Sequence, residues 1–104
     1  VFNNGNHGMV RQWQKIFYNS RFSASELTHH TPDYVKLAEA MGAVGLRMEQ
    51  KSEVKDVFQK MLEINDKPVL VDCVVDPDDM VFPMVPAGGS NDVIILNEED
   101  LKKI

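Results

Sequence analysis

The chain has 104 residues, of which 43% are hydrophobic and 26% charged, which is the composition of one globular domain with a modest core. This excludes a disordered chain or a disulfide framework, and the longest apolar runs, residues 69–75 and 93–96, are far shorter than the ~20 residues of a membrane-spanning helix. The net charge is −5 and neither half carries a basic cluster, so nucleic acid is excluded as a partner. The single cysteine, Cys73, cannot form an internal disulfide and predicts a reducing compartment, the cytoplasm.

The first residues have the pattern of a buried strand that ends in a loop, and we expect the chain to be part of a longer polypeptide. After an Asn and Gly loop over residues 5–8, apolar residues recur with the period of an amphipathic helix that ends near Asn19. These residues are Met9, Trp13, Ile16 and Phe17. Residues 20–32 have no sustained period and predict a loop.

A second helix is predicted after Pro32, with Asp33 at its N-cap and Gly42 at its C-terminal end. Residues 44–48 predict a short strand. Ser52 is the expected N-cap of a third helix, which runs to about Ile64.

Residues 69–75 are almost all β-branched or aliphatic, which is typical of a central strand buried on both faces. The order of elements predicts an α/β fold with a mainly parallel sheet flanked by helices, in residues 1–79, followed by an irregular C-terminal arm in residues 80–104. In such sheets ligands bind beyond the carboxyl ends of the strands. Residues 3–8 lie at such an end and are the first place to look for chemistry.

The segment from Asn3 to Met9 brings amide oxygens and carbonyls to the start of a helix, whose N–H groups favour anions. Hard oxygen ligands of this kind suit Mg²⁺ that is shared with a phosphate. A plain strand-to-helix turn uses the same residue types, so composition alone leaves both interpretations open.

Other reactive side chains are better explained by structure. His29 and His30 are adjacent in a polar loop and have no zinc-ligand spacing, so we interpret them as solvated. Cys73 lies in an apolar strand, which disfavours the thiolate that a nucleophile needs. The acidic run over residues 76–79 is most simply a solvated turn.

The continuous string from Asn3 to Gln14, Asn-Asn-Gly-Asn-His-Gly-Met-Val-Arg-Gln-Trp-Gln, resembles the catalytic subunits of the acetohydroxyacid (acetolactate) synthase family. Residues 36–42, 44–47 and 82–89 are similar to later segments of that family, in the expected order, so the resemblance covers essentially the whole chain. It implies half of a thiamine-diphosphate-binding fold. The Gly-Asp-Gly that opens the family's cofactor motif does not occur in these residues.

The resemblance implies roles for single residues at the cofactor. Asn4 is expected to give its side-chain oxygen to Mg²⁺, and Asn6 its backbone carbonyl. Gly8 is expected to let the backbone pass close to thiamine diphosphate, and Met9 to pack at the cofactor's reactive end.

Trp13 follows Met9 by one helical turn, so both side chains share a face and can reach one pocket. The resemblance implies that Trp13 shapes the pocket of the acceptor 2-ketoacid, favours 2-ketobutyrate there and stacks on herbicides. It places Ala87 in the arm that lines the same channel, with a plain turn as the alternative.

The implied activity depends on thiamine diphosphate and Mg²⁺: pyruvate is decarboxylated and joined to a second 2-ketoacid, pyruvate or 2-ketobutyrate, at the start of valine, leucine and isoleucine biosynthesis. The resemblance also implies FAD on another domain, a homodimer or homotetramer, and a regulatory small subunit. The family's activating glutamate belongs to another domain, supplied by the partner subunit, so none of these 104 residues is predicted to be catalytic and we expect the chain alone to be inactive.

Two alternatives stay open. One is another thiamine-dependent decarboxylase or carboligase, against which Trp13 argues. The other is a non-catalytic binding or assembly module that keeps the fold without the cofactor. A Gly-Asp-Gly strand end on the amino side of Val1 would favour the enzyme.

Overall fold

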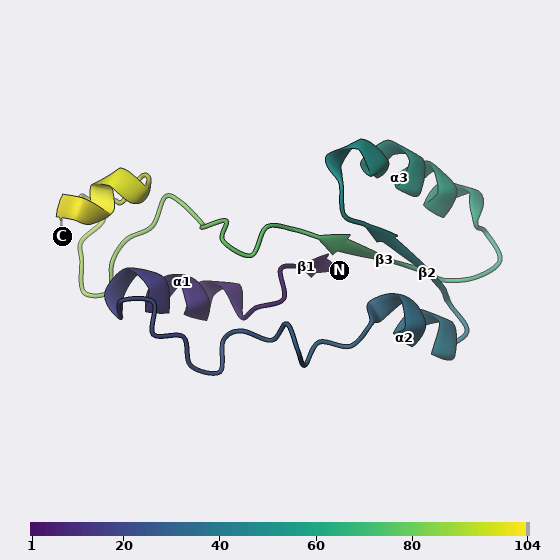
Figure 1. Cartoon of the computed structure of the whole chain (residues 1–104). Coiled ribbons are helices and arrows are strands. Elements are labelled where there is room, and N and C mark those ends of the chain that lie inside the picture. The colour runs from purple at the N-terminus through teal and green to yellow at the C-terminus, as the bar shows by residue number, and fades with distance from the viewer. Residues whose placement is uncertain (104) are drawn as a thin grey trace. The chain divides into compact units, whose positions relative to one another are not determined.

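The computed structural model describes residues 1–103, and residue 104, the last of the predicted arm, lies outside them. The elements, shown in Figure 1, are β1 (Phe2–Asn3), α1 (Gly8–Phe17), α2 (Tyr34–Ala40), β2 (Val44–Met48), the short 3-10 helix η1 (Lys51–Glu53), α3 (Val54–Glu63), β3 (Val69–Val74) and a second 3-10 helix, η2 (Glu98–Lys103). Among the described residues, no helix is long and apolar enough to cross a membrane.

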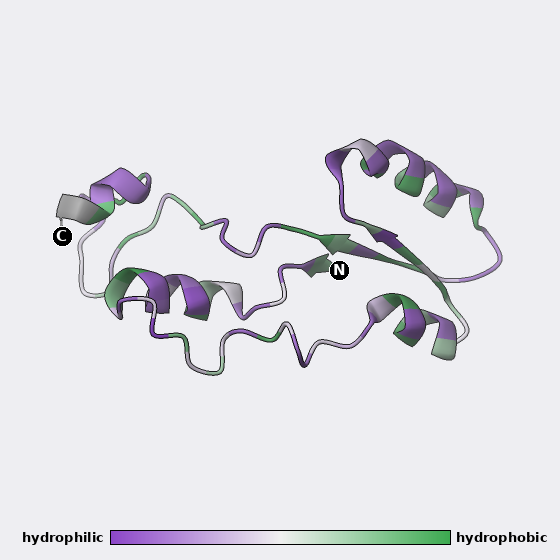
Figure 2. Cartoon of the chain, viewed as in Figure 1, coloured by the Kyte–Doolittle hydropathy of each residue, from purple (hydrophilic) through white to green (hydrophobic). Residues whose placement is uncertain are grey.

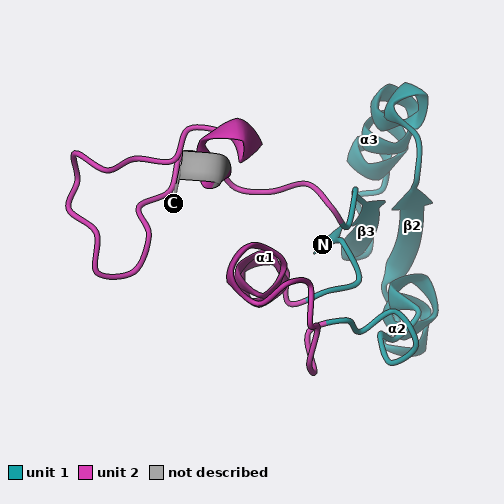
Figure 3. Cartoon of the chain, turned by 60° about the vertical axis from the view of Figure 1, so that its left-hand side comes forward, with its two compact units in different colours: residues 1–6, 26–77 teal, residues 7–25, 78–104 magenta. Residues whose placement is uncertain are grey.

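The chain forms two compact units (Figure 3). Unit 1 contains residues 1–6 and 26–77, with the sheet, α2 and α3. Unit 2 contains residues 7–25 and the chain from residue 78 onward, with α1 and the arm. The predicted division into residues 1–79 and 80–104 stays a prediction.

The sheet of unit 1 has the strand order β1-β3-β2, and both strand pairs are parallel. β3 is central because its β-branched and aliphatic residues can be covered on both faces. It pairs with β2 over the whole of β2, from Val44 opposite Val69 to Met48 opposite Cys73. α2 and α3 lie on opposite sides of these strands (Figure 1), so the predicted α/β fold with a parallel sheet is confirmed.

The core of unit 1 lies between the sheet and α3. Met48, Val71 and Cys73 are buried there, because alternate residues of a strand point to the same face. Four partly buried residues pack against them: Leu46, Val57, Met61 and Val69. Each of the helices α1, α2 and α3 carries both hydrophilic and hydrophobic residues (Figure 2), which is the pattern of helices with one covered face.

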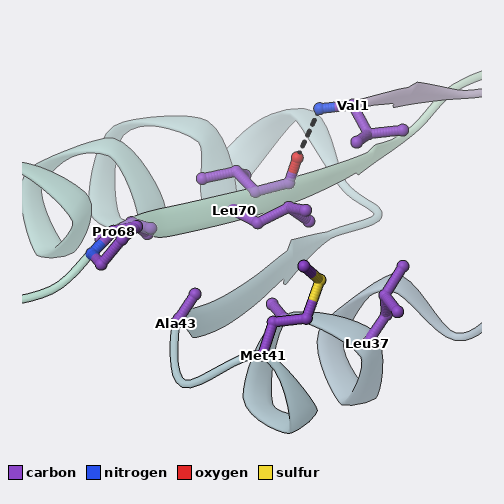
Figure 4. A pocket seen from close by; sticks show the side chains of 9 residues that line it. Val1, Leu37, Met41, Ala43, Pro68 and Leu70 are labelled. Atoms are coloured by element: carbon purple, nitrogen blue, oxygen red, sulfur yellow. Dashed lines mark hydrogen bonds between the residues drawn. The ribbon is translucent and has the colours of Figure 1, made fainter.

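An apolar groove of about 490 Å³ lies between α2 and the first half of β3 (Figure 4). On its rim the backbone nitrogen of Val1 donates a hydrogen bond to the carbonyl oxygen of Val71, at 2.8 Å. All lining side chains are apolar: Val1, Leu37, Ala38, Met41, Ala43, Pro68, Val69, Leu70 and Val71. A ligand site needs polar groups that fix orientation, so this groove is not the candidate for chemistry.

Gly45 allows α2 to lie directly on β2. A Cβ at this position would be 2.6 Å from the carbonyl oxygen of Val35 and 2.7 Å from its Cα, and backbone atoms cannot move aside as a flexible side chain can. We expect Gly45→Ala to lower the free energy of unfolding by about 1–3 kcal/mol. Urea unfolding followed by circular dichroism measures the change, and a variant as stable as the wild type would show that α2 does not pack this closely.

The ends of two helices test the predicted caps. Asp33 is the N-cap of α2, as predicted, and accepts hydrogen bonds from the backbone N–H groups of Val35 and Lys36. The prediction for Ser52 was wrong, because Ser52 lies within η1. The carboxylate of Glu53 caps this turn instead: it accepts from the backbone N–H groups of Glu49 and Gln50, both at 2.8 Å, and these bonds lower its pKa.

Unit 2 is built from α1 and the C-terminal arm. α1 ends at Phe17, two residues before Asn19. A right-handed helix cannot continue through Asn19 and Ser20, because both residues have positive φ values. The arm is mostly irregular, as predicted, but Met84 and Ile95 form an antiparallel bridge within it and the 3-10 helix η2 follows. Ile95 is buried, and its burial anchors this irregular segment.

Candidate cofactor and substrate site

The asparagine loop, residues 3–6, follows β1 at its carboxyl end. Two side chains fold back on the backbone here: the Gly5 N–H donates to Asn3 Oδ1 and the Asn6 N–H donates to Asn4 Oδ1, both at 3.0 Å. The Asn6 side chain in turn donates to the carbonyl oxygen of Asn4, at 2.6 Å. These Asx turns explain why the sequence needs asparagine at successive positions, and Gly5 supplies the positive φ of +66° between them.

A bridge to Glu26 fixes the direction of the Asn6 backbone. Asn6 and Glu26 form an antiparallel bridge, and the Leu27 N–H donates to the carbonyl oxygen of Gly5, at 2.8 Å. In this type of antiparallel bridge, the N–H and C=O groups of Asn6 point away from Glu26, and those of Glu26 point away from Asn6. The Asn6 carbonyl therefore lies on the same side as its N–H, which is the side where Asn4 Oδ1 accepts.

This arrangement fits a hard cation. An amide oxygen has two lone pairs, so Asn4 Oδ1 can accept the Asn6 N–H and still bind a metal ion. Mg²⁺ takes few protein ligands and fills its remaining positions with water and phosphate oxygens. Among the described residues, no group of three or more His, Cys, Asp or Glu side chains could hold a metal ion.

A charged network holds α2 to the sheet within the same unit. Arg47 donates through Nε to Asp72 Oδ2 at 3.0 Å, and through Nη2 to Asp33 Oδ1 at 2.9 Å. Asp72 is fully buried, and it lies opposite Arg47 in the register of β2 and β3. The hydrogen bond to Asp72 raises the pKa of Arg47 further, so this arginine is charged at every accessible pH.

Acid should weaken the N-terminus of α2. The hydrogen bond from the Lys36 N–H, followed by the charge of Arg47, lowers the pKa of Asp33 below its ordinary 3.8. A depressed folded-state pKa means that Asp33 stabilises the fold above pH 3.8, and that this stabilisation is lost as pH falls through the folded-state value. We expect thermal unfolding scans to show it as a drop in Tm toward acid pH that is smaller in Asp33→Asn. An equal drop in both proteins would contradict this role.

The predicted substrate residues meet in unit 2. Trp13 and Ala87 line one cavity of about 290 Å³, together with Phe17, Tyr18 and Pro86. The rings of Trp13 and Phe17 are 5.2 Å apart and tilted by 57°, so each restricts the other's rotation.

Met9 and Gly8 lie at the other end of α1. Met9 is half exposed and is not among the residues that line the Trp13 cavity, although it shares the helix with Trp13. Gly8 is the first residue of α1, and the preceding His7 makes no side-chain cap bond. The first turn contains no acidic residue, so the N–H groups there keep their preference for an anion.

A turn presents Ala87 to the cavity. The Gly89 N–H donates to the carbonyl oxygen of Pro86 at 2.9 Å, and Gly88 has a φ of +78°. This is the geometry of a type II turn with Ala87 at its second position. Ala87 therefore belongs to a turn and also lines the cavity, and its role toward the acceptor stays a prediction.

Sequence reasoning missed two glutamines of α1 that anchor neighbouring backbone without lining the Trp13 cavity. Gln12 binds the backbone of Val81 in the arm, and Gln14 binds the backbone of Ser23 in the loop after α1. They flank Trp13 in the sequence Gln-Trp-Gln. Gln12 is buried, and a buried glutamine needs hydrogen-bond partners, which it finds on the backbone of a residue far away in the sequence. The sequence alone did not indicate this burial.

A parallel sheet with an oxygen-rich loop at the carboxyl end of one strand is the arrangement of an α/β domain that binds ligands at that edge. Residues 1–73 match the family described as "Thiamine pyrophosphate enzyme, C-terminal TPP binding domain". The chain belongs to this family, and the sequence-based recognition is confirmed.

Within the family, the chain is similar to acetolactate synthases. It is 54% identical over 97 residues to the acetolactate synthase large subunit of Mycobacterium tuberculosis, which covers 90% of this chain and 16% of that protein. It is 48% identical over 94 residues to the large subunit of Corynebacterium glutamicum, covering 88% and 15%, and 34% identical over 104 residues to that of Cyanidium caldarium, covering 100% and 18%. The chain thus spans about a sixth of the length of these relatives.

Proposed function

We propose that this chain is the part of an acetolactate synthase that holds the diphosphate end of thiamine diphosphate through Mg²⁺ and that forms one wall of the acceptor pocket. The observation that carries the proposal is the asparagine loop: it follows a parallel strand and lies within residues 1–73, which match the cofactor-binding domain. The proposed reaction decarboxylates pyruvate and joins the product to pyruvate or 2-ketobutyrate, as the first step toward valine, leucine and isoleucine.

At the cofactor, the chain's task is to bind and orient. Asn4 Oδ1 and the Asn6 carbonyl would hold Mg²⁺, and the ion's charge would be balanced by the diphosphate. Gly8 would let the backbone approach the cofactor, Met9 would pack at its reactive end, and the first N–H groups of α1 favour the diphosphate charge. When bound, thiamine diphosphate supplies the electron sink for decarboxylation, which no side chain of this chain can supply.

At the substrate, the chain's task is to select and to exclude water. The Trp13 cavity is lined by aromatic and small apolar residues, so it favours the alkyl end of a 2-ketoacid over water. Pyruvate and 2-ketobutyrate differ there by one methylene, which an apolar pocket distinguishes by about 10- to 200-fold.

We place FAD and the activating glutamate on segments outside these 104 residues, and we propose a homodimer or homotetramer with a regulatory small subunit in the cytoplasm. The length of the relatives leaves room for the segments that would bind FAD and supply the glutamate, since about five sixths of each relative lies outside the matched segment.

The test uses the full-length protein, meaning a polypeptide of the relatives' length that contains these residues. Given thiamine diphosphate, Mg²⁺, FAD and pyruvate, it should form acetolactate, and removal of Mg²⁺ should abolish product formation. The 104-residue chain given the same additions should form none. A full-length protein that binds thiamine diphosphate but forms no acetolactate would favour another thiamine-dependent enzyme, and one that binds no cofactor would favour the assembly module.

A further inference from the structure

Gln12 joins α1 to the C-terminal arm. Its side chain is only 5% exposed. Gln12 Oε1 accepts the Val81 N–H at 2.8 Å, while Gln12 Nε2 donates to the Val81 carbonyl oxygen at 3.1 Å and lies 3.3 Å from Met84 Sδ. The carboxamide of Gln12 thus makes the same pair of hydrogen bonds with Val81 that the backbone of a neighbouring strand would make. Because both bonds are formed, they fix the position and the direction of the arm at Val81.

The same arm forms one wall of the Trp13 cavity. Pro86 and Ala87 follow Val81 closely, and between them Met84 pairs with the buried Ile95 through two backbone hydrogen bonds of 2.9 and 2.8 Å. Gln12 contacts the arm at both Val81 and Met84, so it holds the stretch that leads into the cavity wall. The next residue on α1 is Trp13, which lines the cavity from the helix side.

We propose that Gln12 is a positioning residue that sets the separation of Trp13 and Ala87, and through it the choice of acceptor 2-ketoacid. This inference rests on the proposed function, because only that function gives the cavity an acceptor. A cavity of about 290 Å³ distinguishes two substrates that differ by one methylene only if its walls are held in place. Gln12 touches no substrate in this account and acts through the arm.

Gln14 provides a matched control on the same helix. Gln14 Nε2 donates to the Ser23 carbonyl oxygen at 3.1 Å, and Gln14 Oε1 accepts the Ser23 N–H at 3.3 Å and the hydroxyl of the buried Ser25. Its bonds have the same chemistry as those of Gln12, but they hold the loop after α1 rather than the arm. Replacing Gln14 therefore removes a similar anchor without touching Val81.

The experiment compares Gln12→Met and Gln14→Met in the full-length protein, since methionine keeps the length of the side chain and removes both hydrogen-bonding groups. The first readout is hydrogen exchange of the Val81 N–H, followed by mass spectrometry of its peptide without substrates. The second is the ratio of acetohydroxybutyrate to acetolactate formed from mixed pyruvate and 2-ketobutyrate. The third is the rate with pyruvate alone.

We expect Gln12→Met to raise Val81 exchange at least about tenfold. The product ratio should change by about tenfold, with a much smaller change in the rate with pyruvate alone. Gln14→Met should change neither the Val81 exchange nor the ratio. Unchanged Val81 exchange in Gln12→Met, or faster exchange with an unchanged ratio, would overturn the proposal, as would an equal change of ratio in Gln14→Met. A wild-type protein that forms neither product would overturn the proposed function itself, and Val81 exchange would still test whether Gln12 anchors the arm.

Discussion

Asn4→Ala in the full-length protein is expected to weaken Mg²⁺-dependent binding of thiamine diphosphate severely. The side-chain oxygen of Asn4 is the proposed ligand to the cation, and it also accepts the Asn6 N–H that shapes the loop. The alanine variant loses both, so we expect the Kd for thiamine diphosphate in the presence of Mg²⁺ to rise by about 100-fold or more, beyond the effect of losing an outer-shell partner. Isothermal calorimetry on the cofactor-free protein measures this directly.

Two variants separate ligation from loop shape. Asn4→Asp keeps an oxygen at the same place, and it should retain Mg²⁺-dependent binding. Asn6→Ala removes a side chain that only donates to the Asn4 carbonyl oxygen, and it leaves the proposed backbone ligand intact, so its Kd should change by less than about tenfold. If Asn6→Ala were as damaging as Asn4→Ala, the loop rather than the Asn4 oxygen would be the essential feature.

Trp13→Leu should reduce the preference for 2-ketobutyrate over pyruvate by about tenfold or more. The indole of Trp13 packs against Phe17 and lines the cavity together with Ala87, so leucine leaves a void where the additional methylene of 2-ketobutyrate would make contact. Competition between the two acceptors, with both products measured in one reaction, gives the ratio without separate kinetic constants.

Phe22→Leu is the control for this change. Phe22 is an aromatic residue of the same unit, and Cζ of Arg11 lies 4.4 Å from the centroid of its ring. Phe22 does not line the cavity. Its replacement should leave the product ratio unchanged. A ratio that Trp13→Leu does not alter would mean that the acceptor binds elsewhere.

Most of the fold could be predicted because it depends on local patterns. The β-branched run of β3 carries the signal of a buried parallel strand within its own sequence, and the residues of β2 carry that of a short strand. Asp33 is a strong N-cap in any context. The error at Ser52 has a physical reason. A serine before an amphipathic run is a good N-cap, but the carboxylate of Glu53 satisfies two N–H groups upstream and moves the first turn back into η1.

The candidate site could be predicted only in part. The residues of the asparagine loop are consecutive in the sequence, so they could be identified from the sequence alone, and the family resemblance implies their roles. The meeting of Trp13 with Ala87 depends on an arm without periodicity, and the bond that anchors this arm joins Gln12 to Val81 across most of the chain. Such a long-range backbone partner leaves no pattern in the sequence, which is why the role of Gln12 was missed. Gln14 binds Ser23 only nine residues further on, in a loop that has no periodicity.

The most direct test of the account is a crystal structure of the full-length protein with thiamine diphosphate, in which Mn²⁺ replaces Mg²⁺ so that the metal is located by its anomalous scattering. We expect one peak at the asparagine loop, bonded at about 2.1 Å to Asn4 Oδ1 and to the backbone carbonyl of Asn6, with diphosphate oxygens and water among the other ligands. A cation bound by neither Asn4 nor Asn6, or an Asn4 side chain turned away from the cation, would contradict the central claim.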